Sequence, residues 1–361
     1  MLSPFEIPDT LVMDIGTGTK DVMHFSARHT LENNIKLVVP TPALVMANRL
    51  ERHEGELRVS GYTMGGGYLA KVLTRHRANG NRVVMEEMPA FTVRNNIEEV
   101  EAAGIEIVER VEEPTHVFDE IELPLYYDLL GRFGIDTKKI KVIGISAQDH
   151  GYNTSEESSR RNRFKYFLDH LAGDPSPRAL VFTDTDLPDV FGRLFSGARC
   201  VKHFDHTLRT VLIDTSFSAI LGCGLDPRVA ALRGPVLYIN YGNGHTMACI
   251  MNGSRILSFF EHHTRILKKR PEAMADFMKR LAEGTLSTDE VFDDEGNGCV
   301  TFEPAAFSDL AGVVVTGPQR HLIEQSGLNP FVEASPGGDM MMTGPLGLLR
   351  GISMRRQEVC V

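Results

Sequence analysis

The chain has 361 residues, of which 42% are hydrophobic and 24% are charged. These proportions are typical of folded globular proteins and exclude a disordered or collagen-like chain. Because a single hydrophobic core rarely grows beyond about 250–300 residues, the length favours two domains. The formal net charge of −10 would repel a phosphate backbone, so we expect no nucleic-acid partner.

The sequence also disfavours a membrane-spanning segment and a cysteine-bound metal site. No stretch approaches the roughly 18 consecutive apolar residues that span a bilayer, and the N-terminal sequence MLSPFEIPDT lacks a basic region followed by an apolar run. We therefore expect a cytoplasmic protein without a membrane partner. The five cysteines show neither CxxC nor CxxxCxxC spacing, so neither an iron–sulfur cluster nor a structural zinc ion is expected.

The first strong signal is a glycine- and threonine-rich turn between two apolar runs. Residues 11–14 read as a strand, Gly16-Thr17-Gly18-Thr19-Lys20-Asp21 as a turn, and residues 22–25 as a second strand. A third apolar run, residues 35–39, ends at Pro40. The pattern predicts a β-meander.

Alternating α and β signals follow the meander. A Gly65-Gly66-Gly67 turn is predicted to open a helix that runs to about Ala78, and the β-branched run 139–146 is typical of a strand covered on both faces. That strand ends in Gln148-Asp149-His150, at the carboxyl end of a strand, where open α/β sheets bind ligands. Residues 153–178 are polar and charged, and we expect them to form a surface excursion.

The glycine-rich turn then occurs a second time. The apolar run 236–239 leads into Asn240-Tyr241-Gly242-Asn243-Gly244-His245-Thr246, and each position lies 226 residues after its counterpart in the first turn. Such self-similarity indicates two copies of one supersecondary unit. A valine-rich run, residues 310–316, ends in Gly317-Pro318-Gln319.

Two such hairpins followed by a late glycine segment resemble the acetate kinase, sugar kinase, Hsp70 and actin superfamily. The resemblance implies an α/β fold with two RNase H-like, actin-like ATPase domains, at residues 1–232 and 233–361, closing over ATP and Mg²⁺. It also implies that the two hairpins bind phosphates and that the late glycine segment borders the adenosine. The implied nucleotide-binding residues are Gly16, Thr17, Gly18, Thr19, Lys20, Asn240, Gly242, Asn243, Gly244, His245, Thr246, Gly317, Pro318 and Gln319.

Two further resemblances concern the substrate side. Residues 143–151 are similar to the substrate segment of xylulose and glycerol kinases. The whole chain, including residues 261–264, also resembles a prokaryotic family catalogued under the name pyruvate formate-lyase activating enzyme.

The proposed chemistry follows from residue types. Glycines let backbone N–H groups approach phosphates, and Asp14 at the end of a buried strand is expected to hold Mg²⁺ through water. Asp149 is the candidate general base, with Gln148 orienting substrate or water. The alternatives are structural turns for the glycines and a loop network without catalysis for Asp149. Asn240 stands where the superfamily usually has an aspartate, and a neutral amide holds a hydrated Mg²⁺ ion less strongly than a carboxylate, which favours nucleotide binding over hydrolysis.

A second polar cluster, Glu261-His262-His263, lies near His245 in the sequence pattern. Carboxylate and imidazole groups can ligate Zn²⁺ or Fe²⁺, but adjacent residues of a strand point to opposite faces. We therefore expect these residues, with His150, to form a substrate-cleft wall.

The sequence is compatible with three functions. The leading one is ATP-dependent phosphotransfer to a small hydroxylated or carboxylated metabolite. The second is a nucleotide switch that regulates a partner protein, and the third is a metal-dependent hydrolase centred on Glu261, His262 and His263. The sequence leaves the substrate and the oligomeric state open.

Overall fold

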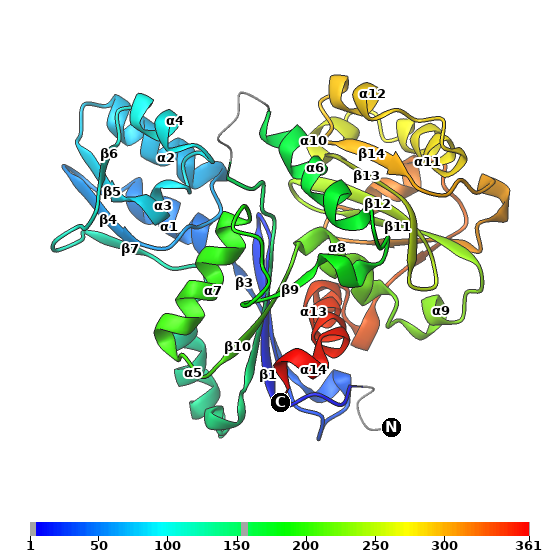
Figure 1. The fold of residues 1–361 in the computed structure, drawn as a ribbon, viewed down its shortest axis with the longest axis horizontal. Helices are drawn as coiled ribbons and strands as arrows, with labels where there is room; N and C mark the ends of the chain where they lie inside the picture. Colours follow the sequence, from blue (N-terminus) through cyan, green and yellow to red (C-terminus); the bar gives the residue numbers. More distant parts are fainter. Residues whose placement is uncertain (1–4, 153–157, 361) are drawn as a thin grey trace.

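The structure is a computed structural model that describes residues 5–152 and 158–360 (Figure 1). Its first six-stranded sheet has the order β3-β2-β1-β8-β10-β9. Strands β1, β2 and β3 form the predicted antiparallel meander, and β1, β8 and β10 run parallel. The strands span Thr10–Ile15 (β1), Thr19–Phe25 (β2), Ile35–Pro40 (β3), Val142–Ala147 (β8), Val181–Thr183 (β9) and Arg209–Ile213 (β10).

The second six-stranded sheet repeats this arrangement in the order β14-β13-β12-β11-β15-β16. Here β11, β12 and β13 form the antiparallel meander, and β11, β15 and β16 run parallel. The strands span Pro235–Tyr241 (β11), His245–Asn252 (β12), Arg255–His263 (β13), Gly298–Thr301 (β14), Gly312–Thr316 (β15) and Phe331–Glu333 (β16). The predicted fold of two RNase H-like units is confirmed.

The registers of the two sheets show how closely the units correspond. Asp14 is paired with Asp21 on β2 and with Ser146 on β8. Asn240 is paired in the same way with Met247 on β12 and with Thr316 on β15. The spacing of 226 residues in the sequence is therefore an equivalence in three dimensions.

A third unit, residues 42–118, is inserted between β3 and β8. Its four strands are all parallel, in the order β6-β5-β4-β7, and they form a core of their own, separate from the two large sheets (upper left in Figure 1). The sequence pattern predicted its α/β alternation but not that it forms a separate sheet. Its elements are α1 (Pro42–Leu50), β4 (Leu57–Gly61), α2 (Gly67–Ala78), β5 (Val83–Glu86), α3 (Glu87–Ala90), α4 (Ile97–Ala102), β6 (Glu106–Val108) and β7 (His116–Phe118).

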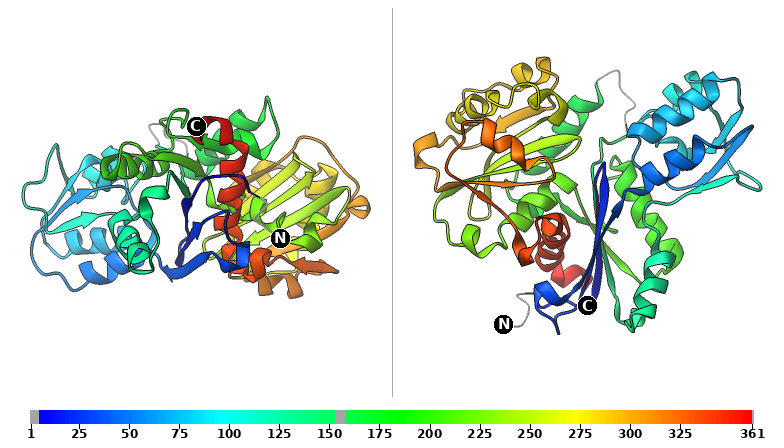
Figure 2. Two further views of the ribbon diagram at one scale, coloured as in Figure 1. Left: turned by 90° about the horizontal axis from the view of Figure 1, so that it is seen from below. Right: turned by 180° about the vertical axis from the view of Figure 1, so that it is seen from behind.

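Two helices join the large sheets. Helix α8 (Thr215–Cys223) contacts β11 and β15, while the late helix α13 (Thr343–Met354) returns to pack on β1 and β8. Figure 2 shows α13, in red, between the two sheets. The predicted domain boundary at 232/233 stays a prediction, and α13 adds a contact across it.

The other helices cover the outer faces. Helices α5 (Leu123–Arg132) and α7 (Gly192–Phe204) flank the first sheet, and α10 (Thr264–Leu267), α11 (Ala273–Glu283) and α12 (Thr288–Asp293) flank the second. Two further short helices are α9 (Pro227–Ala230) and α14 (Arg356–Val359). No helix in this part of the chain is long and apolar enough to cross a membrane.

The expectation of a surface excursion over residues 153–178 was wrong for most of the segment. Residues 159–171 form helix α6 (Ser159–Leu171), in which Arg163, Phe164, Phe167 and Leu171 are buried. Residues 153–157 lie outside the described residues. The many charged positions concealed a buried stripe, because a helix buries only the side chains that face the core.

The α8–α13 contact yields a stability prediction. A Cβ on Gly347 would lie 1.7 Å from the carbonyl oxygen of Ser218, so the two backbones touch. We expect Gly347→Ala to lower the free energy of unfolding by at least about 2 kcal/mol, since an added methyl forces the helices apart. Gly131→Ala on exposed helix α5 is the control, because a Cβ there meets no atom within 4 Å. Urea unfolding that shows equal losses for both variants would contradict the close approach.

Candidate functional site

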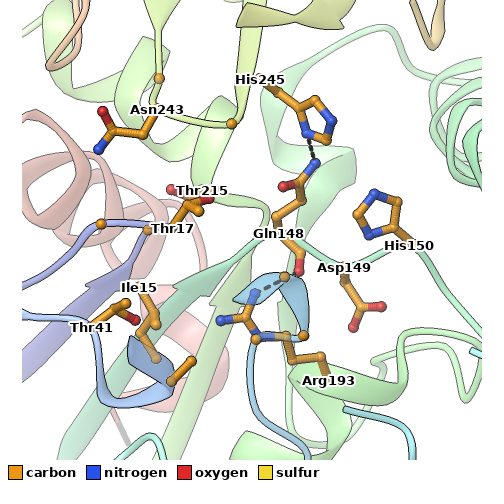
Figure 3. Close-up of a pocket in the computed structure, with 18 of the residues that line it drawn as sticks. Ile15, Thr17, Thr41, Gln148, Asp149, His150, Arg193, Thr215, Asn243 and His245 are labelled. Carbon is orange, nitrogen blue, oxygen red and sulfur yellow. Dashed lines mark hydrogen bonds between the residues drawn. The ribbon is translucent and has the colours of Figure 1, made fainter. Parts of the chain in front are cut away.

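One cavity of about 620 Å³ lies where the two large sheets and the inserted unit meet. The first hairpin (residues 14–21) and the second hairpin (residues 240–246) form opposite walls, and Figure 3 shows several of the lining side chains. The lining residues include Asp14, Gly16, Thr17, Gly18, Thr19, Asp21, Gly65, Gly66, Gly67, Phe91, Gln148, Asp149, His150, Tyr152, Arg193, Asn240, Gly242, Asn243, Gly244, His245, His263, Gly317 and Pro318.

The two hairpins touch across the cavity. Each turn is closed by the same bond, from Gly16 N–H to Thr19 O at 2.9 Å and from Gly242 N–H to His245 O at 3.0 Å. A Cβ on Gly18 would lie 2.7 Å from Asn243 Nδ2, and a Cβ on Gly244 would lie 3.0 Å from Thr17 Oγ1. Glycine at these two positions therefore lets the facing turns approach each other.

Lys20 and Thr246 do not reach the cavity. Successive side chains of a strand point to opposite faces, so Thr19 and Asp21 face the cavity while Lys20 faces away. Lys20 is fully buried and donates to Ile121 O at 2.8 Å and to Glu122 Oε2 at 3.3 Å. Thr246 is equally buried and lies 3.0 Å from Thr264 Oγ1. The expectation that these two residues contact nucleotide was wrong.

The late glycine segment lies beside the second hairpin. Gly317 has a φ of +97°, and a Cβ there would lie 2.4 Å from Tyr241 O, so glycine is required. Gln319 is outside the cavity lining, and its Nε2 donates to Asn243 Oδ1 at 3.0 Å. Gln319 thus orients the second hairpin.

Asp14 and Asp21 form a pair of buried carboxylates in the first hairpin. Asp14 is 9% exposed, and its Oδ1 accepts from Ser146 Oγ at 2.5 Å and from Thr215 Oγ1 at 2.6 Å. Asp21 is 6% exposed, and its Oδ1 has no hydrogen-bond partner among the described residues. Burial raises the pKa of Asp14 to about 6, and burial together with Asp14 raises the pKa of Asp21 to about 8.

Asp149 has a structural task in addition to its place at the cavity. Its Oδ1 accepts from Gly151 N–H at 2.8 Å and its Oδ2 from Leu194 N–H at 2.9 Å, so the carboxylate secures the start of α7. Arg163 Nη1 donates to its carbonyl oxygen at 2.5 Å. These contacts favour the loop-network alternative over the general-base role predicted for Asp149.

Two neutral imidazoles and an amide lie beside Asp149 at this end of the cavity. The Gln148 amide donates to Nδ1 of His245, and the rings of His150 and His245 are 5.9 Å apart (Figure 3). Burial lowers the pKa of His150 to about 3 and that of His245 to about 4, so both imidazoles are neutral at pH 7. His150 makes no hydrogen bond to any described residue, which leaves its ring nitrogens available to a ligand.

A buried arginine that the sequence interpretation missed lies beneath His245. Arg163 binds Glu261 through two nitrogens, Nε and Nη2, each at 2.9 Å, and Asp214 at 2.7 Å. Asn297 Nδ2 donates to Glu261 Oε2 at 2.7 Å. Burial alone would raise the pKa of Glu261, but Arg163 outweighs it and lowers the pKa to about 2. No sequence signal marks Arg163, since it lies in a charged run.

The Glu261-His262-His263 cluster is divided between two faces of β13. Glu261 is fully buried against Arg163, and His263 lines the cavity rim. His262 faces the other side, where its Nε2 lies 3.0 Å from Asp294 Oδ2 and its ring stacks on Phe260. Glu261 and His262 are thus not substrate-wall residues, and the three groups do not converge on one ion. Among the described residues, no group of three or more His, Cys, Asp or Glu side chains is placed to hold a metal ion.

Arg193 is a second residue that sequence interpretation missed. From α7 it donates to both oxygens of Glu120, at 2.7 and 2.9 Å, and to Gln148 O at 3.0 Å. Glu120 also accepts from Gly65 N–H at 3.0 Å. This chain of contacts connects the Gly65–Gly67 loop of the inserted unit to the Gln148 segment.

The repeated sheets and the facing hairpins define an actin-like ATPase fold of the type shared with sugar kinases. The chain belongs to the family described as "Putative pyruvate format-lyase activating enzyme (DUF1786)", whose model matches residues 64–322. The predicted resemblances to the sugar kinase, Hsp70 and actin superfamily and to this prokaryotic family are confirmed. No curated protein matches the chain in sequence.

Similar solved structures include kinases and an activator. A ROK hexokinase from Thermus thermophilus is 12% identical, with 95% of this chain and 98% of that chain covered, at a TM-score of 0.33. The activator of the 2-hydroxyisocaproyl-CoA dehydratase from Clostridium difficile, with bound ADPNP, is 11% identical over 97% of each chain at 0.33. An inorganic polyphosphate/ATP-glucomannokinase from Arthrobacter sp. strain KM is 11% identical over 97% and 100% at 0.37.

The Arg163–Glu261 pair leads to a prediction about pH. The pKa of Glu261 falls from 4.5 to about 2 on folding, so its contribution to stability is present above pH 4.5 and lost as the pH falls towards 2. We expect Glu261→Gln to lower the free energy of unfolding at pH 7 by about 3 kcal/mol or more, because Arg163 loses one of its two acidic partners. The loss should shrink between pH 4.5 and pH 2.

The matched control is Glu303→Gln, which removes an exposed carboxylate bound to Arg255. Exposed pairs contribute about 0–1 kcal/mol, so this variant should follow the wild type at every pH. Urea unfolding across the pH series measures both variants. A Glu261→Gln loss that does not depend on pH would contradict an ionised Glu261 in the folded state.

Proposed function

We propose that this protein binds ATP between its two hairpins and transfers the terminal phosphoryl group to a small hydroxylated or carboxylated metabolite. The observation that carries the proposal is that two equivalent glycine hairpins face each other across one cavity. Gly317 and Pro318 line this cavity beside the second hairpin. Backbone N–H groups at glycine turns form anion-binding concavities. A pair of such turns suits a chain of phosphates better than a single anion.

Asp14 is the residue suited to hold Mg²⁺ beside the phosphates. It lies at the end of β1, lines the cavity and has hydroxyl donors on Oδ1 only. When bound, the ion would neutralise charge on the transferring phosphoryl group. The hairpins would hold the β- and γ-phosphates in line with the acceptor.

The acceptor would bind at the Gln148 end of the cavity. In Figure 3 Thr17 and Asn243 lie on one side, and Gln148 and His150 lie on the other. The rings of Phe91 and Tyr152, 4.0 Å apart, form an apolar wall nearby. We propose that His150 positions the acceptor: its neutral ring accepts a hydrogen bond from the acceptor hydroxyl, the acceptor oxygen bonds to the γ-phosphorus as the bond to the ADP oxygen breaks, and the hydroxyl proton passes to an oxygen of the transferred phosphoryl group.

A second candidate is a nucleotide switch that acts on a partner protein. It is favoured by Asn240, which replaces a carboxylate in the second hairpin, and by Asp149, whose two oxygens both accept backbone N–H groups. With few charged groups free to act on a substrate, bound nucleotide would persist. The two candidates differ in whether an acceptor accelerates ATP turnover.

Nucleotide binding itself is tested by thermal melting. Millimolar ATP with Mg²⁺ should raise the melting temperature by several degrees, because a ligand that binds only the folded state stabilises it. Gly18→Val should abolish most of the rise, because the valine side chain fills the space between the two hairpins. The variant should still fold, since the added Cβ meets only the flexible side-chain amide of Asn243. Gly173→Val, at a position with no atom within 4 Å, is the control. An unchanged wild-type melting temperature would refute the nucleotide site.

The enzyme and switch candidates are separated at His150. His150→Gln should lower phosphotransfer by about 10², the scale of loss when an acceptor is misplaced, while ATP affinity stays near that of the wild type. ATP turnover over a panel of polyols and hydroxy acids measures the first quantity, and titration calorimetry measures the second. The control is His203→Gln, on the exposed part of α7. A wild type that no acceptor stimulates, together with an indifferent His150→Gln variant, would favour the switch.

A further inference from the structure

Asp21 is a buried acid that the fold does not require. It stands directly opposite Asp14 in the antiparallel β1–β2 pair, so the two side chains leave the same face, and both line the cavity. Asp21 is 6% exposed, and its Oδ1 has no hydrogen-bond partner in the described part of the chain. An unpartnered carboxylate oxygen in a closed wall is costly unless a ligand satisfies it.

The basic side chains near Asp14 and Asp21 form their ion pairs with other acids. Lys20, between Thr19 and Asp21, points to the opposite face and pairs with Glu122. Arg193 is held by Glu120 and Arg163 by Glu261 and Asp214. Neither Asp14 nor Asp21 forms an ion pair within the described residues. Arg193 lowers the pKa of Asp14, whereas Asp214 raises the pKa of Asp14 and Asp339 raises that of Asp21. The two carboxyl groups therefore lie together in the cavity wall without a cationic partner among the described residues.

The second unit of the same chain provides an internal comparison. The positions equivalent to Asp14 and Asp21 are Asn240 and Met247, which are paired in the same register. Met247 is fully buried, so the hairpin folds with an apolar side chain at this place. The first hairpin thus holds two carboxylates where the second holds none. This asymmetry points to a ligand that binds on one side of the cavity.

We propose that Asp21 and Asp14 together form a two-carboxylate site for a divalent cation of the Mg²⁺ class, in which Asp21 is a direct ligand. Hard cations prefer carboxylate oxygens, and Mg²⁺ is commonly held by one or two carboxylates, with water and substrate phosphates completing its shell. The carboxylate that Asn240 lacks is supplied by Asp21, from the facing hairpin. The contribution to catalysis rests on the proposed function, whereas cation binding is measurable without nucleotide.

The test compares the wild type with Asp21→Asn and Asp21→Met, the latter copying the second unit. In a chelating buffer both variants should melt at a higher temperature than the wild type, because the cost of burying the Asp21 carboxyl group beside Asp14 without a cation is removed. Millimolar Mg²⁺ without nucleotide should raise the melting temperature of the wild type and leave the variants almost unchanged. Electron paramagnetic resonance with Mn²⁺ alone should show that both variants bind Mn²⁺ about tenfold or more weakly than the wild type does.

Asp309→Asn removes the same charge from an exposed position and should behave as the wild type. Variants that bind Mn²⁺ as the wild type does, or that melt at or below the wild-type temperature in the chelating buffer, would overturn the proposal and make Asp21 a structural residue. A wild type that responds to Mg²⁺ but not to ATP would refute the nucleotide site while leaving the cation site intact. A response to ATP with no binding of Mn²⁺ alone would refute the cation site instead.

Discussion

The buried guanidinium of Arg163 is the contact on which the arrangement of the cavity depends. It binds Glu261 of the second sheet, Asp214 at the start of α8 and the carbonyl of Asp149. A buried ion pair of this kind contributes little net stability relative to an apolar core, yet losing one partner is costly because a charge is left unpaired. Arg163 therefore ties helix α6, both large sheets and the Gln148–His150 segment into one geometry.

The two-residue period of the strands decides which polar side chains enter the cavity. On β2 it sends Thr19 and Asp21 inward and Lys20 away. On β13 it separates His263 at the rim from His262, which binds Asp294. The same rule in both units explains why Lys20 and Thr246, at equivalent positions, are both buried away from the cavity. The first hairpin thus presents backbone, threonine hydroxyl and two carboxyl groups to the cavity, whereas Met247 and Thr246 of the second unit stay out of it.

The inserted unit closes the remaining side of the cavity. Its Gly65–Gly67 loop and the segment from Phe91 to Asn96 line the wall next to the first hairpin. Arg193 and Glu120 connect that loop to Gln148. A substrate that contacts the inserted unit would thus be coupled to the groups beside His150 through a short chain of hydrogen bonds.

Local patterns in the sequence determined the two hairpins, the late glycine segment and the repeated units, because turns and strand alternation depend on neighbouring residues. Only the tertiary structure decided what depends on distant ones. Arg163 meets Glu261 across 98 positions, and α13 returns to β1 from the far end of the chain. Asp149 caps α7 because Leu194, 45 positions away, brings its N–H to the carboxylate. Such contacts leave no local periodicity, so residue types alone could not assign these roles.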